Sequence, residues 1–227
     1  MNDSSIKILS TKKLMSNQRQ FLLNAGFSLV EADFISIDFI KTDLKVTNDF
    51  LLFTSQNAVN SLLSNENFED LKEKKCFCVG KKTKVLLDQN GFQVLQAFDY
   101  VEELTPFLIT NYSQNSFTFF SGNLRQDTLP VALQKEGVIF EEKQVYTTSL
   151  TPKKINSQVD GILFFSPSAV QSYLIENNLS NEICFCIGTT TAKEVEKTTK
   201  NVVIANQPTV ENVIIQSINY FKNENSK

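Results

Sequence analysis

The chain has 227 residues, a formal net charge of −3, 41% hydrophobic residues and no histidine. The small charge provides no basic surface for nucleic acid, and no apolar run approaches the ~20 residues that a membrane-spanning helix needs. The absence of histidine removes the commonest general base and metal ligand, so any catalysis depends on hydroxyls, carboxylates, lysine, arginine or backbone dipoles.

Short apolar runs alternate with helix-like segments along the chain. Several runs are almost continuously apolar, which is typical of parallel strands buried on both faces. The predicted strands, in chain order, are Ile6–Leu9, Ser28–Val30, Phe50–Phe53, Cys76–Val79, Gln93–Leu95, Phe117–Phe120, Val138–Phe140, Gly161–Phe165, Ile183–Ile187 and Val202–Ile204. Helical spacing is clear in Thr83–Gln89 and Thr190–Lys197, whereas Asn111–Ser116 predicts a loop and Asn223–Lys227 a frayed end. The alternation predicts α/β domains with helices on both faces of a parallel sheet.

The sequence repeats itself over about half its length. Three segments recur in the second half at offsets of 111, 111 and 108 residues: Phe53–Val59 as Phe164–Val170, Gly26–Glu31 as Gly137–Glu142, and Cys76–Gly80 as Cys184–Gly188. This period is too long for a solenoid, so two similar domains are the natural interpretation. The chain length also favours two domains, with about five strands each.

Four cysteines form two Cys-x-Cys pairs, Cys76/Cys78 and Cys184/Cys186. Residues two apart on a strand face the same side, so we interpret these thiols as small core side chains. A four-thiolate metal site is the alternative, but its usual spacing is C-x₂₋₄-C and the two pairs are far apart in the chain. The segment Met1–Ser5 lacks a secretory signal pattern, so we expect a cytoplasmic protein, in which disulfides are disfavoured.

Small polar residues follow the predicted strands. They are Thr54–Asn57 after Phe53, Gly80–Thr83 after Val79, Ser121–Asn123 after Phe120, Ser166–Ser168 after Phe165 and Gly188–Thr191 after Ile187. Each segment alone is explained as helix capping. Together they predict a ligand site, because the carboxyl ends of parallel strands gather at one edge of a sheet, where helix N-termini bind anions. Two such edges facing each other would form a cleft suited to a substrate with several carboxylates.

The order and spacing of these segments resemble the uroporphyrinogen-III synthase family along nearly the whole chain. The matching segments are Phe53–Val59, Val79–Thr83, Asn90–Phe92, Ser121–Arg125, Gln144–Thr148, Phe164–Val170, Ile187–Ala192 and Ala205–Thr209. Each segment alone is weak evidence for the family, since Ser, Thr and Gly occupy many strand–helix turns. The resemblance rests on the order and spacing of all the segments together.

The resemblance implies two similar α/β/α domains with five-stranded parallel sheets, joined by a two-stranded connector. Residues 1–34 and 150–227 would form one domain and residues 42–141 the other. The connector strands would be residues 35–41 and 142–149. The repeat alone predicts a single division near the middle of the chain, so the discontinuous division comes from the family.

The resemblance also implies a lyase of haem biosynthesis that needs no metal and no cofactor. Its reaction would convert hydroxymethylbilane into uroporphyrinogen III, with loss of water and inversion of ring D. Most of that task is holding a flexible substrate with many carboxylates in one productive coil, which fits a site without histidine. We expect a monomer that binds this small-molecule substrate, makes transient contact with the preceding deaminase, and contacts neither nucleic acid nor membrane.

The expected catalytic residue is Tyr146, whose hydroxyl is protonated at neutral pH and would donate a hydrogen bond to the departing hydroxyl group. A tyrosine that merely packs in the connector is the alternative. The residues expected to bind substrate are Ser55, Gln56, Asn57, Thr83, Gly122, Asn123, Arg125, Ser166, Pro167, Ser168, Ala169, Thr190 and Thr191. Arg125, expected just inside a helix, would equally suit a structural ion pair.

The sequence departs from the family pattern at several lysines. Lys12 stands where the family often has arginine after the first strand. Lys84 follows Thr83, where small residues are usual, and Lys81 and Lys82 precede it. These cations would either help to bind carboxylates or form a solvated helix face, and charge runs are usually solvated.

Two other functions are compatible with this architecture. One is a non-catalytic two-domain protein that binds tetrapyrroles or other carboxylates, which would bind ligand tightly without turnover. The other is a different two-domain enzyme, such as a nucleotide-sugar transferase, but the chain has no G-x-G-x-x-G or Walker A sequence to support it.

Overall fold

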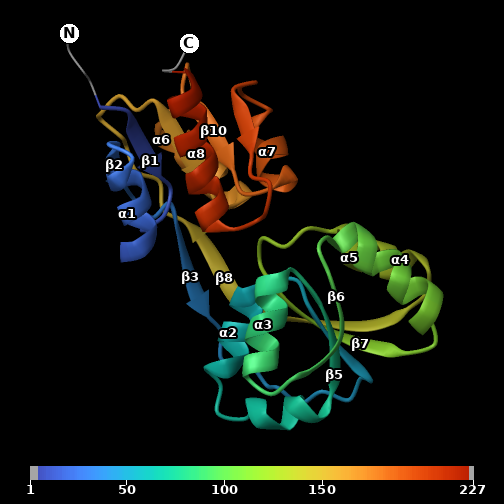
Figure 1. Cartoon of the computed structure of the whole chain (residues 1–227). Coiled ribbons are helices and arrows are strands. Elements are labelled where there is room, and N and C mark those ends of the chain that lie inside the picture. Colours follow the sequence, from blue (N-terminus) through green and yellow to red (C-terminus); the bar gives the residue numbers. More distant parts are fainter. Residues whose placement is uncertain (1–4, 225–227) are drawn as a thin grey trace. The chain divides into compact units, whose positions relative to one another are not determined.

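The structure is a computed structural model that describes residues 5–224, in which the chain divides into two units (Figure 1). Unit 1 comprises the residues up to Ser36 and those from Ser149 onward, and unit 2 comprises Ile37–Thr148. No helix among residues 5–224 is long and apolar enough to cross a membrane. The structure contains two sheets, one for each unit.

The sheet of unit 1 has five strands in the order β11-β10-β9-β1-β2, and all neighbours are parallel. The strands are β1 (Lys7–Ser10), β2 (Ser28–Glu31), β9 (Gly161–Phe164), β10 (Ile183–Cys186) and β11 (Val202–Ile204). The helices are α1 (Ser16–Asn24), α6 (Pro167–Glu176), α7 (Thr189–Val195) and α8 (Val210–Glu224). The winding direction reverses between β1 and β9, which is where ligands bind in sheets of this topology.

Alternating side chains of the unit 1 strands enter two cores. Ile162 and Phe164 pack with residues of α6 and α7, whereas Leu163 between them packs with residues of α1 and α8. Figure 1 shows α1 and α8 close to each other in this unit. Because helices cover both faces, the strands must be apolar at nearly every position, and this explains their continuous apolar runs.

The second sheet has six strands in the order β3-β8-β7-β4-β5-β6. The strands are β3 (Ile35–Phe39), β4 (Phe50–Phe53), β5 (Lys75–Val79), β6 (Gln93–Phe98), β7 (Ser116–Gly122) and β8 (Ile139–Leu150). The helices are α2 (Gln56–Leu63), α3 (Lys81–Gln89), α4 (Val101–Tyr112) and α5 (Thr128–Lys135), with the 3₁₀ helix η1 (Phe68–Glu73). Neighbours from β8 to β6 are parallel. Leu51 and Phe53 pack on the α2 and α3 side, and Leu52 packs on the α4 and α5 side.

The second sheet has six strands where five were expected. The residues expected to form a short strand, Val138–Phe140, and a separate connector strand, 142–149, belong to one continuous strand, β8. β8 contains no glycine or proline to interrupt it and is rich in β-branched and aromatic residues. β3, from the other expected connector segment, lies beside β8 and adds the sixth strand.

The other predicted strands and helices are present, with some shifted ends. The expected loop Asn111–Ser116 is shorter, because α4 continues to Tyr112 and β7 begins at Ser116. α8 extends into the end that was expected to be frayed. The rest of that end, residues 225–227, and the first four residues of Met1–Ser5 lie outside the described residues.

The four cysteines lie fully buried in β5 and β10, as their spacing predicts. Burial is the main cause that raises the pKa of Cys76, Cys184 and Cys186 to about 12 and that of Cys78 to about 11. The thiols therefore stay protonated and pack as small apolar side chains. Within the described range, no cluster of three His, Cys, Asp or Glu side chains could hold a metal ion.

Candidate functional site

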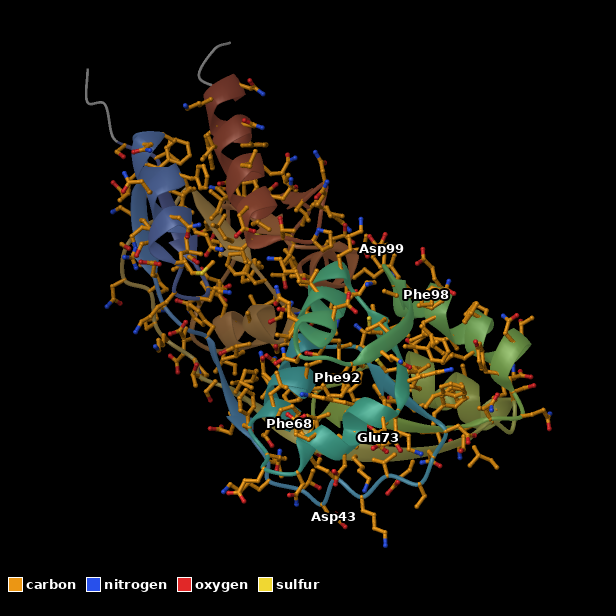
Figure 2. All side chains as sticks on the ribbon, turned by 60° about the horizontal axis from the view of Figure 1, so that its bottom comes forward. Asp43, Phe68, Glu73, Phe92, Phe98 and Asp99 are labelled. Carbon is orange, nitrogen blue, oxygen red and sulfur yellow. The ribbon has the colours of Figure 1, made fainter. Side chains whose placement is uncertain are left out.

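The polar turns of each unit lie at the carboxyl edge of its sheet. In unit 2 this is the edge at which β6 ends. Figure 2 shows Phe98 and Asp99 there, at the opposite end of the unit from Glu73 and Asp43. Parallel sheets bind ligands at their carboxyl edges, where helix N-termini also gather, so these turns form the candidate site of each unit.

Ser55 begins α2 of unit 2 as its N-cap. Its hydroxyl accepts a hydrogen bond of 3.1 Å from the backbone N–H of Asn57 and so satisfies one of the free donors at the helix start. Gln56 is the first helical residue, and its side chain is exposed. Ser55 and Asn57 therefore shape the turn, and Gln56 is the residue of the three best placed to reach a ligand.

Gly80 turns the chain from β5 into α3 with a φ of 91°, a left-handed conformation that favours glycine. A Cβ at Gly80 would lie 3.5 Å from the hydroxyl of Thr83, and Thr83 is only 4% exposed. Thr83 therefore packs beneath the turn. The exposed side chains of this turn are the lysines at positions 81, 82 and 84.

Tyr146 lies on β8 directly beside Gly122 on β7. A Cβ on Gly122 would lie 2.3 Å from Cζ of the Tyr146 ring, so the ring rests on bare backbone. The half-buried ring also packs against the core under α2 and α3. The missing side chain of Gly122 thus makes room for the ring that carries the expected catalytic hydroxyl.

The side-chain amide of Asn123 is hydrogen-bonded to the backbone of β8. Its Nδ2 donates to the carbonyl oxygen of Thr148 at 3.1 Å, and the N–H of Thr148 donates to its Oδ1 at 2.7 Å. The two bonds extend the link between β7 and β8 beyond the last residue of β7. The Asn123 side chain therefore holds the turn after β7 in place.

Arg125 is paired with two carboxylates. Its Nε and Nη2 donate to the two oxygens of Glu142 at 2.6 and 2.9 Å, and its Nη1 pairs with Asp127. Ser121 also donates to Glu142, at 2.6 Å. The hydrogen bonds from Arg125 are the main cause that lowers the pKa of Glu142, and the bond to Glu142 is the main cause that raises the pKa of Arg125.

The position of Arg125 differs from the expectation that it lies just inside a helix. It lies in the loop after β7, and α5 begins only at Thr128. Because its charge is balanced by Glu142 and Asp127, the structure favours the structural ion pair that the sequence left as an alternative.

In unit 1, Ser166 is the N-cap of α6. Its hydroxyl accepts a hydrogen bond of 3.1 Å from the N–H of Ala169 and lies 3.0 Å from the hydroxyl of Ser168. Pro167 occupies the first helical position, where its missing N–H carries no cost. Ala169 is buried, so it can offer a ligand no more than its backbone, whereas the two serine hydroxyls are half-buried.

Lys12 lies at the neighbouring strand end, where the winding of the unit 1 sheet reverses. Its Nζ stands 5.5 Å from the ring centroid of Phe165, a cation–π contact that orients the ammonium group beside the β9–α6 turn. Thr11 ties the two strand ends together by donating to the carbonyl oxygen of Leu163 at 2.7 Å. Lys12 was not among the expected binding residues, although its place after the first strand was a signal for it.

The two threonines expected to bind substrate in the β10–α7 turn differ in exposure. Gly188 is the N-cap of α7, and Thr190 is exposed in its first turn. Thr191 is only 2% exposed and packs into the unit. The hydroxyl of Thr190 is therefore accessible, as is that of the neighbouring Thr189, whereas that of Thr191 is not.

The carboxyl edges thus offer hydroxyl and amide donors, lysine ammonium groups, helix N-termini and the phenol of Tyr146. The half-buried or exposed side chains in these turns include those of Lys12, Ser55, Gln56, Tyr146, Ser166, Ser168, Thr189 and Thr190. Each edge can therefore bind carboxylates through hydroxyls, amides and the positive ends of helix dipoles. Among these side chains, Tyr146 is the candidate donor for a leaving hydroxyl group.

Comparisons with known proteins agree with this arrangement. The family model described as uroporphyrinogen-III synthase HemD matches residues 19–215. A search of curated proteins found no match. The structure is similar to that of uroporphyrinogen-III synthetase from Helicobacter pylori, with a TM-score of 0.70 and 20% identity over 95% of this chain and 99% of that chain. It is also similar to a crystal structure of wild-type uroporphyrinogen III synthase from Thermus thermophilus, with a TM-score of 0.52 and 13% identity over 97% of this chain and 99% of that one.

At such low identities the structural matches bear on the fold, and they agree with α/β units built on parallel sheets. The family model covers most of the sequence, including the turns after β4, β5, β7, β9 and β10. The chain therefore belongs to the uroporphyrinogen-III synthase family.

Proposed function

We propose that this chain closes hydroxymethylbilane into uroporphyrinogen III, with loss of water and inversion of ring D. Family membership makes it a lyase of tetrapyrrole biosynthesis. The observation that carries the proposal is the family match over residues 19–215. That range includes Gly122 and Tyr146, whose packing holds a phenol at an edge of the sheet that is rich in hydrogen-bond donors.

The chemistry of the reaction suits such a site. In the bilane, the lone pair of a pyrrole nitrogen expels the terminal hydroxyl group, which leaves as water after gaining a proton. The resulting electrophile closes head to tail without help and gives the symmetric type I ring. The enzyme must instead direct attack to the substituted carbon of ring D, so that a spiro intermediate fragments and recloses with that ring inverted. This task requires orientation of the substrate more than strong acid–base groups.

Tyr146 would assist the departure of the hydroxyl group by donating a hydrogen bond. Packing on Gly122 and on the core holds its ring in one orientation, and preorganised donors are the effective ones in catalysis. The proton lost later from the closing ring restores the balance of the reaction, so that only water leaves.

The accessible side chains would bind the substrate carboxylates. In unit 2 these are Ser55 and Gln56, and in unit 1 they are Lys12, Ser166, Ser168 and Thr190. Five of the expected binding residues would act through their backbone and through the shape of the turns. They are Asn57, Thr83, Pro167, Ala169 and Thr191. Gly122, Asn123 and Arg125 would act by holding Tyr146 and the β7–α5 turn in place.

We further infer that the protein acts as a monomer in the cytoplasm. The large exposed apolar side chains that are known from the structure come from many different elements, which is usual for a monomer, and the four free thiols fit a reducing compartment. Transient contact with the deaminase that releases the bilane would shorten the time in which the bilane closes without catalysis.

A coupled assay tests the proposed function. Hydroxymethylbilane is generated in situ from porphobilinogen with a deaminase, and the oxidised uroporphyrin isomers are separated by chromatography. Addition of the chain should shift the product from type I to type III. Only type I product from a folded sample would reject the reaction, and tight binding of the bilane in that case would favour the non-catalytic binding protein.

A further inference from the structure

The segment of β8 immediately before Tyr146 departs from regular strand geometry. The β7–β8 ladder skips Val145, because its neighbours Gln144 and Tyr146 pair with consecutive residues of β7. Adjacent residues of a regular strand point to opposite faces, yet the side chains of Val145 and Tyr146 both pack against the core under α2 and α3. The backbone at Val145 therefore forms a bulge that sets the direction of the Tyr146 ring.

The carbonyl group of Val145 accepts two hydrogen bonds from outside β7. One comes from the backbone N–H of Ile40, at 2.8 Å, and the other comes from the hydroxyl of Ser61 on α2. Ser61 and Val145 are both fully buried, so the bond between them is shielded from solvent. A carbonyl oxygen has two lone pairs, and both are used here. The Ser61 hydroxyl thereby joins α2 to the peptide group that precedes Tyr146.

The position of Ser61 is itself fixed by the two ends of α2. Its carbonyl oxygen accepts hydrogen bonds from the side chains of Ser64, at 2.7 Å, and Asn65, at 2.8 Å, just after the helix. The other end begins at the N-cap Ser55, in the turn of the candidate site. Because hydrogen bonds hold both ends of this helix, the hydroxyl of Ser61 is a preorganised donor for the bulge.

The internal repeat places a second serine at the corresponding position of unit 1. The offset of 111 residues that relates Ser55 to Ser166 also relates Ser61 of α2 to Ser172 of α6. Ser172 is fully buried as well, but its hydroxyl has no hydrogen-bond partner among residues 5–224. The packing of this helix on its sheet therefore does not require a bonded hydroxyl, and the bond made by Ser61 is a specific feature of the unit that carries Tyr146.

We propose that Ser61 is a positioning residue for Tyr146, because its hydroxyl holds the bulge at Val145 and the bulge directs the phenol. The proposal rests on the proposed function, since the direction of the phenol affects turnover only if the chain performs that reaction. Ser61 is buried under α2 and contacts no substrate. Loss of its hydroxyl should therefore lower kcat and leave KM unchanged.

The coupled assay measures this effect in the parent, Ser61→Ala, Tyr146→Phe and the double variant. Ser61→Ala should lower kcat for type III product on the order of tenfold, since it displaces the phenol without removing it. If Ser61 acts through Tyr146, its replacement should lower kcat no further in the Tyr146→Phe background. Equal losses in the two backgrounds would overturn the proposal, because they indicate a general loss of stability. Parent-like kcat in Tyr146→Phe would overturn it too.

The orientation of the ring can be measured independently of turnover. In the full chain labelled with isotope-enriched tyrosine, the NMR ring signals of Tyr146 are those that Tyr146→Phe removes. Ser61→Ala should shift or broaden these signals. Ser172→Ala is the matched control, because it deletes a buried hydroxyl from the corresponding position of unit 1 and should change neither the signals nor kcat. Unchanged Tyr146 signals in Ser61→Ala would overturn the proposal.

A second variant covers the case in which Ser61→Ala does not fold. Ser61→Cys keeps nearly the same side-chain size, but its thiol is only a weak donor, so it should show the same changes to a smaller extent. Parent-like kcat and parent-like Tyr146 signals in Ser61→Cys would then reject the positioning role.

The parent chain in the coupled assay separates this proposal from the proposed function. If the parent forms type III product and Ser61→Ala keeps the parent kcat, the reaction stands and the positioning role is rejected. If the parent forms only type I product, the proposed function is rejected. Tyr146 signals that still move in Ser61→Ala would in that case keep Ser61 as the residue that orients this ring, and unmoved signals would reject that role as well.

Discussion

The ring of Tyr146 rests on the bare backbone of Gly122, its partner across the β7–β8 ladder. The register of that ladder shifts between Ser121 and Gly122, immediately before the pair. A β-bulge re-aims side chains and often occurs beside functional sites. The glycine, the shifted register and the ring together determine where the phenol hydroxyl lies.

Replacement of Gly122 by alanine should displace the Tyr146 ring, because the new Cβ would lie 2.3 Å from Cζ. Overpacking of this kind costs about 1–3 kcal/mol, so we expect a lower free energy of unfolding together with a loss of type III product. Denaturant unfolding and the coupled assay measure the two effects. Gly188→Ala is the control for stability, because nothing lies within 4 Å of a Cβ there. Equal stability losses in the two variants would contradict the packing argument.

Replacement of Tyr146 by phenylalanine keeps the ring on Gly122 and removes only the hydroxyl. Turnover to the type III isomer should fall by about 10²-fold, the low end for loss of a positioned proton donor, while the free energy of unfolding stays close to that of the parent. Tyr112→Phe is the control, because Tyr112 packs against Phe50 and Phe77 on the opposite face of the same sheet. Unchanged turnover in Tyr146→Phe would leave this tyrosine as a packing residue.

Glu142 should make stability depend on pH in the acid range. Its pKa is lowered from the ordinary value of 4.5, mainly by Arg125, so its contribution is present above about pH 4.5 and is lost as the pH falls through the lowered pKa. Glu142→Gln should reduce the free energy of unfolding at pH 7 by about 0.5–1 kcal/mol, because solvent screens this partly exposed pair, and it should flatten the decline in acid. Chemical unfolding between pH 7 and pH 3 measures this. An acid profile identical to that of the parent would show that the Arg125–Glu142 pair does not contribute to stability. Glu136→Gln, at another exposed position, serves as the control.

The buried cysteines should be unreactive in the native chain. Their thiols are fully buried and their pKa values are raised to about 11 or 12, so a thiol reagent at pH 8 should label them only after unfolding. Because the folded pKa values lie above the ordinary value of 9.0, their contribution to stability is complete below about pH 9 and declines as the pH rises toward 12. Rapid labelling of a folded sample would show that a core opens.

Much of the fold could be predicted from local sequence. Continuously apolar runs such as Phe50–Phe53 and Gly161–Phe164 identify buried parallel strands, and the serines at 55 and 166 mark helix starts that the structure confirms. These features depend on side-chain periodicity and capping, which act over a few neighbouring residues. The family resemblance, which rests on the order of such segments, is also a property of the sequence alone.

The roles of single residues in the turns depended on contacts between distant segments. Asn123 is hydrogen-bonded to Thr148, and Arg125 forms an ion pair with Glu142. The local sequence pattern around Asn123 and Arg125 indicates neither partner. Thr190 and Thr191 are adjacent and chemically alike, yet one is exposed and the other buried. The packing of the helix on its sheet decides this difference.

The sequence by itself determined the α/β class, the strand positions, the repeat and the family. Only the tertiary structure decided that β8 is one strand in a six-stranded sheet, that Tyr146 packs on Gly122, and that Ser61 donates a hydrogen bond to Val145. The reason is that propensity and periodicity are written in neighbouring residues, whereas strand register and side-chain exposure follow from the packing of segments that are far apart in the chain.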